Sequence, residues 1–316
     1  MLLNCLEHIS RRELKGAEVI VVEAADLPEP AEADAVKYLK IPSGEAGFSR
    51  QRNLGIKNAS GEYIIFIDDD IEITDGWFDA LTRYTLVPDG SAGAIGATFP
   101  HVNGASLISF SEGVMGHPGG GFRLHALSDN KDLVLSQIST CNTILKKSIV
   151  EAAGGFDERT IFGSEDTDLS MRITEKLGGG KFRYLPGALV WHYSKTRYSD
   201  MCAWYFRRGR ADADLLRHHS VHLSYFISTA VSIKIVFVAA GSYIFGLWFA
   251  PVSFFLWYFV QLFRTGFMFN YFYLYDFTRT KRMAALFCFP LIKLSADLMF
   301  DLGRAKGLCG GIRGEG

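Results

Sequence analysis

The sequence predicts an α/β domain with a mostly parallel sheet and flanking helices, followed by an α-helical membrane region. In the first two thirds of the chain, short runs of β-branched residues alternate with segments of helical periodicity, which is typical of layered α/β folds. From Tyr225 to Phe263 the chain is almost continuously apolar, with Lys234 as its one charged residue. Because a membrane-spanning helix needs about 20 apolar residues, this stretch predicts a hairpin of two such helices that turns near residues 241–251.

The α/β part contains helices and strands in alternation. Apolar residues at helical spacing predict the helices, and β-branched runs bounded by turn-forming residues predict the strands. The predicted elements are helices over residues 2–14, 48–57 and 77–84, strands over 17–22, 36–41 and 63–67, and a loop over 27–34. The glycine-rich stretch 91–130 is predicted to be an irregular connection, with a flexible active-site loop as the alternative. Ligands of α/β sheets bind beyond the carboxyl ends of the strands, so the strand ends are the first places to search for a functional site.

Three consecutive carboxylates, Asp68, Asp69 and Asp70, follow the strand predicted over residues 63–67. Like charges held at one point repel each other, and Mg²⁺ and Mn²⁺ prefer oxygen ligands that they share with substrate phosphates. The triplet therefore predicts a divalent-metal site that holds a phosphorylated donor. A solvated strand end that runs into a turn is the structural alternative, because aspartate is common in turns.

A second acidic cluster follows a glycine-rich approach. Glu165 and Asp166 lie at the predicted start of a helix, where the helix dipole favours acids, so capping is the structural alternative for one of them. A carboxylate held at a helix start can accept a proton from an incoming hydroxyl group. His192 ends a short strand predicted over residues 184–192, and it is interpreted either as a structural histidine or as a further metal ligand.

Basic residues flank the apolar stretch and predict its orientation. Because positive charge gathers on the cytoplasmic side of a membrane, both ends of the hairpin are expected in the cytoplasm. The flanking residues are Arg207, Arg208, Arg210 and Arg217 before the stretch, and Arg264, Arg279, Lys281 and Arg282 after it. A further apolar run over residues 283–300 is predicted either to span the membrane or to lie at its surface. A very hydrophobic soluble helical subdomain is the alternative for the whole region.

The composition narrows the class of partner. The 33 Lys and Arg residues are balanced by 34 Asp and Glu residues, so no basic excess is available to neutralise a nucleic acid. The five cysteines are scattered, without the spacing of a zinc site or a disulfide framework, which indicates a reducing compartment.

Over residues 1–210 the sequence resembles the family 2 glycosyltransferases, inverting enzymes with the GT-A fold. Four segments stand in the family's order, and each carries the expected chemistry. They are AEVIVVE (17–23), GFSRQRNLGIKNASGEYIIFIDDD (47–70), NTILKKSIVEAAGGFDERTIFGSEDTDLSMRI (142–173) and LPGALVWHY (185–193).

The resemblance implies a role for each matching residue. Asp68 and Asp70 would form the DxD pair that coordinates Mg²⁺ or Mn²⁺ on the diphosphate of a nucleotide-sugar donor, with Asp69 alongside. Asp166 would be the general base, and Glu165 would position the acceptor or the base. The remaining implied roles are a further metal ligand (His192), support of the nucleotide (Arg52 and Asn53) and recognition of the base (Glu23, where the family usually carries an aspartate).

These observations predict a metal-dependent inverting glycosyltransferase that moves a sugar to a hydroxyl group of a glycan, in polysaccharide biosynthesis. A lipid-linked acceptor is expected, because an acceptor held in the bilayer requires the catalytic domain to stay close. We expect a multi-pass protein of the inner (plasma) membrane with its catalytic domain in the cytoplasm and no nucleic-acid partner; the sequence predicts no oligomeric state. The predicted domains are a catalytic domain (1–210), an amphipathic connector (211–224), a transmembrane hairpin (225–263), and a cytoplasmic loop with a third apolar helix and a flexible tail (264–316).

The sequence departs from the family at its start. The family usually begins with a strand and a proline-containing turn that help to form the nucleotide pocket, whereas Met1 opens directly on the following helix. Three explanations stay open: a truncated gene model, another segment in the place of the strand, and a degenerate domain. The last of these supports an alternative function, a non-catalytic partner in a membrane glycan-assembly complex. A processive synthase that exports its polymer is disfavoured, because the sequence has no convincing QxxRW motif.

Overall fold

The computed structural model describes residues 2–10, 16–24, 36–86, 90–128, 133–160, 162–176, 181–219 and 229–310. The chain divides into two compact units, which are described separately below. Unit 1 comprises Met1–Phe99 and Gly116–Tyr193, and unit 2 comprises Pro100–Met115 and Ser194–Gly316. The predicted loop over residues 27–34, the end of the first predicted helix and the predicted tail lie outside the described residues.

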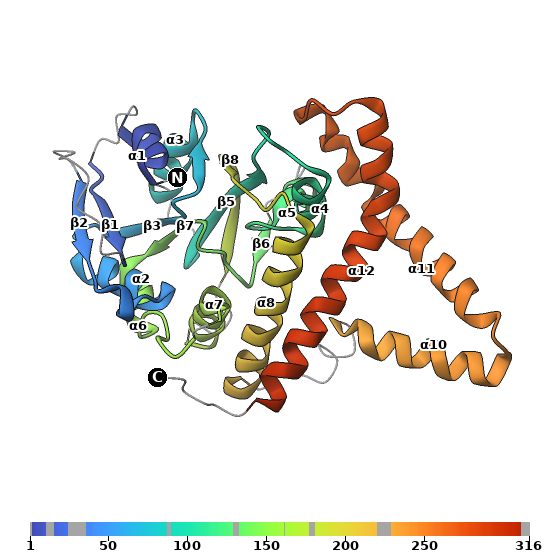
Figure 1. Cartoon of the computed structure of the whole chain (residues 1–316). Helices are drawn as coiled ribbons and strands as arrows, with labels where there is room; N and C mark the ends of the chain where they lie inside the picture. Colours follow the sequence, from blue (N-terminus) through green and yellow to red (C-terminus); the bar gives the residue numbers. More distant parts are fainter. Residues whose placement is uncertain are drawn as a thin grey trace. The chain divides into compact units, whose positions relative to one another are not determined.

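Unit 1 contains two sheets (Figure 1). In the smaller one, β1 (Val19–Glu23) and β2 (Val36–Lys40) pair in parallel. The larger one has the strand order β3-β7-β5-β8-β4, and β6 pairs with β8. Its strands are β3 (Tyr63–Ile67), β4 (Ile71–Ile73), β5 (Gly93–Pro100), β6 (Val134–Leu135), β7 (Asn142–Lys146) and β8 (Phe182–His192).

The orientation of the strands corrects one expectation. A mostly parallel sheet was expected, but β7 pairs antiparallel with both β3 and β5, and β8 pairs antiparallel with both β4 and β6. Among the described strands, β3 forms the edge of the larger sheet, and the parallel pair β1–β2 is not hydrogen-bonded to it. The fold is therefore a mixed α/β sheet with flanking helices.

Helices cover both faces of the larger sheet, because its strands alternate their side chains. Phe66 of β3 and Leu145 of β7 point into a core built with α2, α6 and α7, whereas Ile65 and Ile144 point into a second core built with α1 and α3. The helices of unit 1 are α1 (Leu2–Ser10), α2 (Phe48–Asn58), α3 (Trp77–Leu86), α5 (Gly121–Ser128), α6 (Lys147–Ala152) and α7 (Glu165–Lys176), with a short 3₁₀ turn η1 (Ser43–Glu45).

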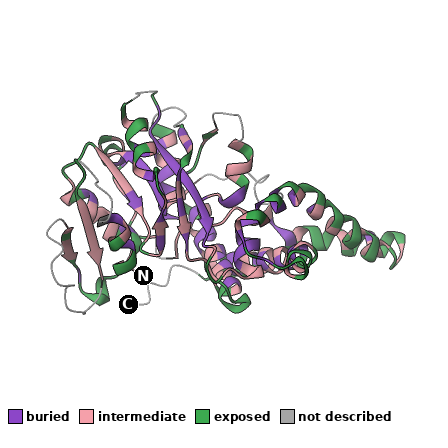
Figure 2. Ribbon diagram, turned by 90° about the horizontal axis from the view of Figure 1, so that it is seen from above, coloured by how far each residue is buried: buried purple, intermediate pink, exposed green. Residues whose placement is uncertain are grey.

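The glycine-rich middle of the chain is ordered, which the sequence did not predict. It contains β5, whose eight residues are all buried, as Figure 2 shows in purple at the centre of unit 1. A Cβ on Gly93 would lie 2.4 Å from the Ile144 carbonyl oxygen, and a Cβ on Gly96 would lie 2.3 Å from Asn142 Nδ2. These glycines let β5 approach its neighbours closely, so they are required by the packing of a strand and do not belong to an irregular connection.

Unit 2 is helical. Its elements are α4 (Leu107–Met115), α8 (Tyr198–His218), α10 (Val231–Phe245), α11 (Phe249–Thr265), the 3₁₀ segment η2 (Gly266–Leu274) and α12 (Arg279–Cys309). The turn of the predicted hairpin falls between α10 and α11, at residues 246–248, inside the predicted range. By length and composition alone, the segments Phe249–Leu274 and Arg279–Cys309 are long and apolar enough to cross a membrane, and Val231–Phe245 is a shorter apolar helix.

Candidate active site

The three aspartates occupy the tight connection between β3 and β4. The backbone N–H of Asp68 donates to the carbonyl oxygen of Cys141 on the β7 side, and the carbonyl oxygen of Asp70 accepts from the N–H of Tyr193. These hydrogen bonds to the backbone fix the triplet at the end of β3.

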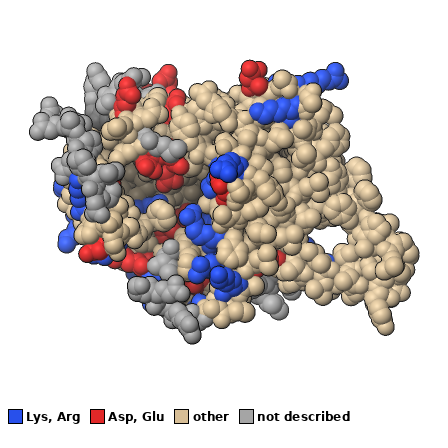
Figure 3. Space-filling model, viewed as in Figure 1, with Lys and Arg blue, Asp and Glu red and all other residues tan. Residues whose placement is uncertain are grey.

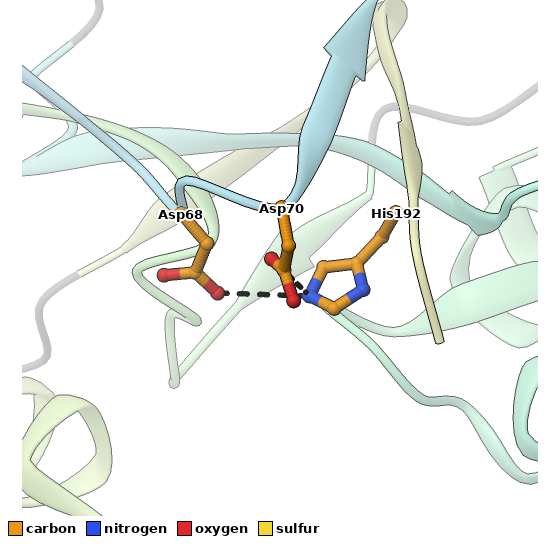
Figure 4. A group of neighbouring side chains, drawn as sticks. All are labelled: Asp68, Asp70 and His192. Carbon is orange, nitrogen blue, oxygen red and sulfur yellow. Dashed lines mark ion pairs between the residues drawn. The ribbon is translucent and has the colours of Figure 1, made fainter. Parts of the chain in front are cut away.

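His192 joins this triplet from the end of β8. It faces Ile71 in the register between β8 and β4, which brings its ring beside the start of β4. Its Nε2 lies 3.2 Å from Asp70 Oδ1 and 3.7 Å from Asp68 Oδ2, and Figure 4 shows the three side chains pointing toward one another. Their ligand atoms all lie within 4.8 Å of one another.

The chemistry of these three residues fits a divalent cation. Burial raises the pKa of Asp70 above its ordinary value; His192 opposes this shift, whereas the neighbouring carboxylates of Asp68 and Asp69 add to it. Asp70 Oδ1 is buried, and apart from the 3.2 Å ion-pair contact with His192 it accepts no hydrogen bond from the described residues. A cation bound here would relieve both the repulsion and the unmet acceptor, and two carboxylates with one imidazole suit Mn²⁺ and similar ions.

Two cysteines lie close to the triplet but are poor metal ligands. Burial raises the pKa of the Cys5 and Cys141 thiols to about 12, so both stay protonated near neutral pH. Because the thiolate is the form that ligates metals, the candidate ligands remain the two carboxylates and the histidine.

Arg52 connects the triplet to the second acidic cluster. From α2, its Nη1 lies 2.7 Å from Glu165 Oε1 at the start of α7, and its Nη2 lies 3.6 Å from Asp68 Oδ1. The guanidinium group lies over the rings of Phe48 and Phe156, 5.8 and 5.6 Å from their centroids. No role was predicted for these two aromatic residues, although both lie inside the matching segments 47–70 and 142–173.

The acids at the start of α7 differ in their partners. Glu165 is buried and paired with Arg52, and Asp168 is buried and paired with Arg172 at 2.5 Å. Asp166 is partly exposed and forms no ion pair with the described residues; its Oδ1 accepts from the backbone N–H of Thr167. Asp166 is therefore the acid of this cluster whose charge is not neutralised by an arginine.

Asn53 ties α2 to the loop that precedes α7. Its Nδ2 donates to the Phe156 carbonyl oxygen and to Glu158 Oε1, and its Oδ1 accepts from the Phe156 N–H. Gly155 has a φ of 70°, and a Cβ there would lie 2.8 Å from Asn53 Oδ1. The amide group of Asn53 is thus engaged within the protein, whereas support of a nucleotide was expected for it.

A cavity of about 1020 Å³ lies beside the triplet. Asp68, Asp69 and Arg52 contribute to its wall, together with apolar residues of β1 and β3. Figure 3 shows acidic side chains gathered at the rim of a hollow on this face of the molecule. Glu23 lies at the carboxyl end of β1 and accepts a hydrogen bond from the Tyr38 hydroxyl group.

Residues 1–151 match the family model described as Glycosyl transferase family 2. The pre-mycofactocin glycosyltransferase of Mycobacterium tuberculosis (strain CDC 1551 / Oshkosh) is 27% identical over 224 residues, which cover 65% of this chain and 44% of that protein. The GalNAc(5)-diNAcBac-PP-undecaprenol beta-1,3-glucosyltransferase of Campylobacter jejuni subsp. jejuni serotype O:2 is 28% identical over 178 residues, 53% of each protein. The chain thus spans about half the length of these relatives.

Among solved structures, the mannosyltransferase PcManGT from Pyrobaculum calidifontis, in complex with GDP-Man and Mn²⁺, aligns with a TM-score of 0.53 and 13% identity, covering 98% of this chain and 83% of that one. At this identity the likeness shows the fold alone. The fold and the matches together define the class: the chain carries a glycosyltransferase domain of family 2 with the GT-A fold. The predicted family and enzyme class are confirmed at this level.

Proposed function

We propose that this protein is a metal-dependent inverting glycosyltransferase that moves a sugar from a nucleotide-sugar donor to a hydroxyl group of a glycan. The observation that carries the proposal is the cluster of Asp68, Asp70 and His192, which Arg52 links to the start of α7, where Asp166 lies. The cluster offers ligands for a cation, and α7 offers a carboxylate that no arginine neutralises.

The donor would bind along the cavity beside the triplet. Asp68, Asp70 and His192 would hold a divalent cation, Mg²⁺ or Mn²⁺, which when bound stabilises negative charge on a diphosphate leaving group. Asp69 shares the cavity wall with Asp68, and Glu23 is the candidate for contact with the base. Mn²⁺ accompanies the donor GDP-Man in the mannosyltransferase with the same fold, which supports this assignment.

Asp166 is the candidate general base. Its carboxylate accepts the proton of the acceptor hydroxyl group, whose oxygen attacks the anomeric carbon as the sugar–phosphate bond breaks. The oxygen attacks from the face opposite the leaving group, and the bonding electron pair leaves with the nucleoside diphosphate, so the sugar is transferred with inversion. Glu165, held by Arg52, positions the first turn of α7 for this step.

We further propose that the acceptor is lipid-linked and that the protein acts at a membrane. The relative from Campylobacter jejuni is named for an undecaprenol-linked acceptor, and unit 2 carries apolar helices that weakly indicate membrane association. The basic residues on both sides of the hairpin favour a cytoplasmic catalytic unit at the inner membrane.

Replacement of the base tests the catalytic assignment. In membranes that carry the protein, Asp166→Asn should lower kcat by about 10²- to 10⁴-fold without changing donor binding, because the amide accepts no proton. Asp200→Asn is the matched control, since Asp200 lies in the first turn of α8, and it should leave turnover unchanged. Wild-type transfer by a folded Asp166→Asn protein would rule out the base.

Chelation tests the metal assignment separately. A chelator should abolish transfer, and added Mn²⁺ or Mg²⁺ should restore it, because the charge on the leaving diphosphate would otherwise lack stabilisation. Undiminished activity of Asp70→Ala, or transfer that is indifferent to the chelator, would contradict the metal role.

One observation favours a second candidate, a non-catalytic partner in a glycan-assembly complex. Within the described residues, the β1–β2 pair is not hydrogen-bonded to β3, and the cavity separates them, so the wall of the donor site is open. Calorimetric titration of nucleoside diphosphates with Mn²⁺ separates the two candidates: a scaffold shows no metal-dependent binding, whereas an enzyme does.

A further inference from the structure

The helices α10 and α11 form a hairpin whose two ends are held at different points of α12. At one end, the N–H of Ser232 in α10 donates to Asp301 Oδ2 of α12 at 2.7 Å. Along the other arm, the hydroxyl group of Tyr258 in α11 donates to the Phe287 carbonyl oxygen of α12 at 2.7 Å. The three helices thus enclose a triangle, with α12 as the base and the turn at residues 246–248 as the tip (Figure 1). We call α10 and α11 with this turn the wedge.

The exposed surface of the wedge is largely apolar. In α10, the consecutive residues Ile235, Val236 and Phe237 are 48%, 66% and 69% exposed, and consecutive helical residues point about 100° apart. Exposure around the helix, rather than along one stripe, is expected of a helix that lipid surrounds and not of one that enters a protein groove. Figure 2 colours most of the wedge as exposed, and Figure 3 shows it almost free of charged side chains.

The tip of the wedge is exposed, and the charged residues of the wedge lie at the ends of its two arms, away from the tip. At the tip, Tyr243 is 93% exposed and Leu247 is 87% exposed. The one charged residue of the wedge before Arg264 is Lys234, in the first turn of α10 and close to the base. Charges confined to the ends of the arms suit the headgroup layer of a bilayer, and an uncharged tip suits its hydrocarbon.

The wedge is too short to cross a bilayer. α10 has 15 residues and α11 has 17, which at about 1.5 Å per residue gives lengths of roughly 22 and 25 Å. The hydrocarbon core of a bilayer is about 30 Å thick. Because the two arms converge from separate points of α12, the tip stands no more than about 22 Å from that helix.

The described residues that flank the wedge directly are engaged in the core of unit 2. The residue before α10, Ala230, has extended backbone and is buried. After α11, Met268 and Phe269 of η2 are buried, and Phe269 packs against Phe110 of α4.

α12 is long enough to span a membrane. One of its faces packs inside unit 2, whereas Phe287 and Leu291 on α12 are 50% and 48% exposed. Ala285, Phe289 and Ala296 are almost fully buried. A Cβ on Gly303 would lie 1.9 Å from the Phe206 carbonyl oxygen of α8, so α12 lies directly against α8. A membrane-spanning α12 would carry the charged helix α8 into the hydrocarbon.

We propose that the wedge enters a single leaflet of the bilayer and returns to the same side, so that this part of the protein is monotopic. The occupant of its apolar surface is lipid, with α12 near the headgroups and the tip near the bilayer centre. This inference rests on the membrane attachment proposed above and gives it a depth and a topology. It differs from the spanning hairpin that the sequence predicts.

Cysteine labelling of the tip tests the topology. The full-length chain with Leu247→Cys, and with the exposed Cys288 and Cys309 replaced by serine, is inserted into phosphatidylethanolamine–phosphatidylglycerol vesicles that carry a membrane-impermeant maleimide on both sides. We expect no labelling at position 247 until detergent is added. Thr280→Cys, at an exposed position just inside α12, should be labelled at once, and the chain that retains Leu247 is the blank.

Each result of the labelling has one meaning. Labelling of Leu247→Cys without detergent places the tip at the far surface and overturns the single-leaflet topology, although membrane attachment stands. A chain that stays in the supernatant overturns attachment as well. Sugar transfer is measured separately, so neither result is confused with loss of the proposed catalytic function.

A charge at the tip tests the depth. Leu247→Lys should lower partition into the same vesicles by about a hundredfold, because a lysine at the bilayer centre is strongly disfavoured. Leu86→Lys is the matched control, since Leu86 is 72% exposed in unit 1, and it should leave partition unchanged. Equal partition of the two variants would overturn the proposed depth, because a lysine at a headgroup surface is tolerated.

Discussion

Individual residues at the candidate site differ in how completely they are engaged. Arg52 holds Glu165 and approaches Asp68, and Asn53 is bound to the loop that contains Phe156. In contrast, Asp166 forms no ion pair with any residue that the structure describes, and Asp70 has an acceptor atom without a hydrogen bond. Asp166 and Asp70, which no arginine of the described residues pairs with, are the acids for which the proposed reaction needs a free carboxylate and a bound cation.

His192 allows a test of the cation site that does not depend on turnover. His192→Ala removes one of three candidate ligands, so the affinity for Mn²⁺ should fall by about 10- to 100-fold or more. Isothermal titration with Mn²⁺ alone measures it. His218→Gln, at an exposed position near the end of α8, is the control, and its affinity should equal that of the wild type. Unchanged Mn²⁺ binding in His192→Ala would assign His192 a structural role.

At the scale of elements, the position of α7 depends on a loop that α2 holds. The loop bends at Gly154 and Gly155, whose φ angles are 89° and 70°, in the region that favours glycine. Asn53 closes this bend with hydrogen bonds to both polar groups of the Phe156 backbone. This bend precedes α7 in the chain, so the hydrogen bonds of Asn53 help to position the start of α7 with Glu165 and Asp166.

Loss of the Asn53 side chain should loosen this connection. Asn53→Ala leaves buried backbone groups without partners, which should lower the free energy of unfolding by about 1–3 kcal/mol. Asn58→Ala in the same helix is the control, because Asn58 Nδ2 bonds only to the Leu54 carbonyl oxygen one turn earlier. Urea unfolding in detergent measures both variants, and equal losses would contradict the role of Asn53.

At the scale of the whole molecule, unit 1 combines a dense core with a large cavity. Leu145 is fully buried among the side chains of α2, α6 and α7. Ile65, by contrast, contributes to the wall of the cavity between β1 and β3. The two parts of the same unit should therefore respond differently to the loss of side-chain volume.

This contrast predicts unequal costs for two similar truncations. Leu145→Ala should lower the free energy of unfolding by about 2–5 kcal/mol, because it opens a new void in a packed core. Ile65→Ala should cost less than about 2 kcal/mol, since some contacts of Ile65 are already missing on the cavity side. Urea unfolding followed by near-ultraviolet circular dichroism compares the two, and an equal or larger loss for Ile65→Ala would mean that the cavity is filled in solution.

Much of the fold could be predicted from local patterns. The strand at residues 63–67 and the helices near 48–57 and 77–84 were placed within two residues of their observed ends, because their periodicity and turn residues are local signals. The strand and helices within residues 91–130 could not be predicted, because glycines usually indicate loops. Gly93 and Gly96 are instead required by the close contact of β5 with neighbouring strands, which the local sequence does not reveal. The mixed strand orientation was missed for a similar reason, because pairing is a long-range property.

The sequence by itself determined the family, the carboxylates at the end of β3 and the acids at the start of α7, because each is a contiguous motif with its own chemistry. Only the tertiary structure decided which of these acids are neutralised. Arg52 reaches Glu165 across 113 positions of the chain, and His192 reaches Asp70 through the register of β8 on β4. Such contacts depend on packing between distant segments, which no local pattern encodes. They distinguish Asp166 and the Asp68–Asp70–His192 cluster from the neighbouring acids Glu165 and Asp168, which arginines neutralise.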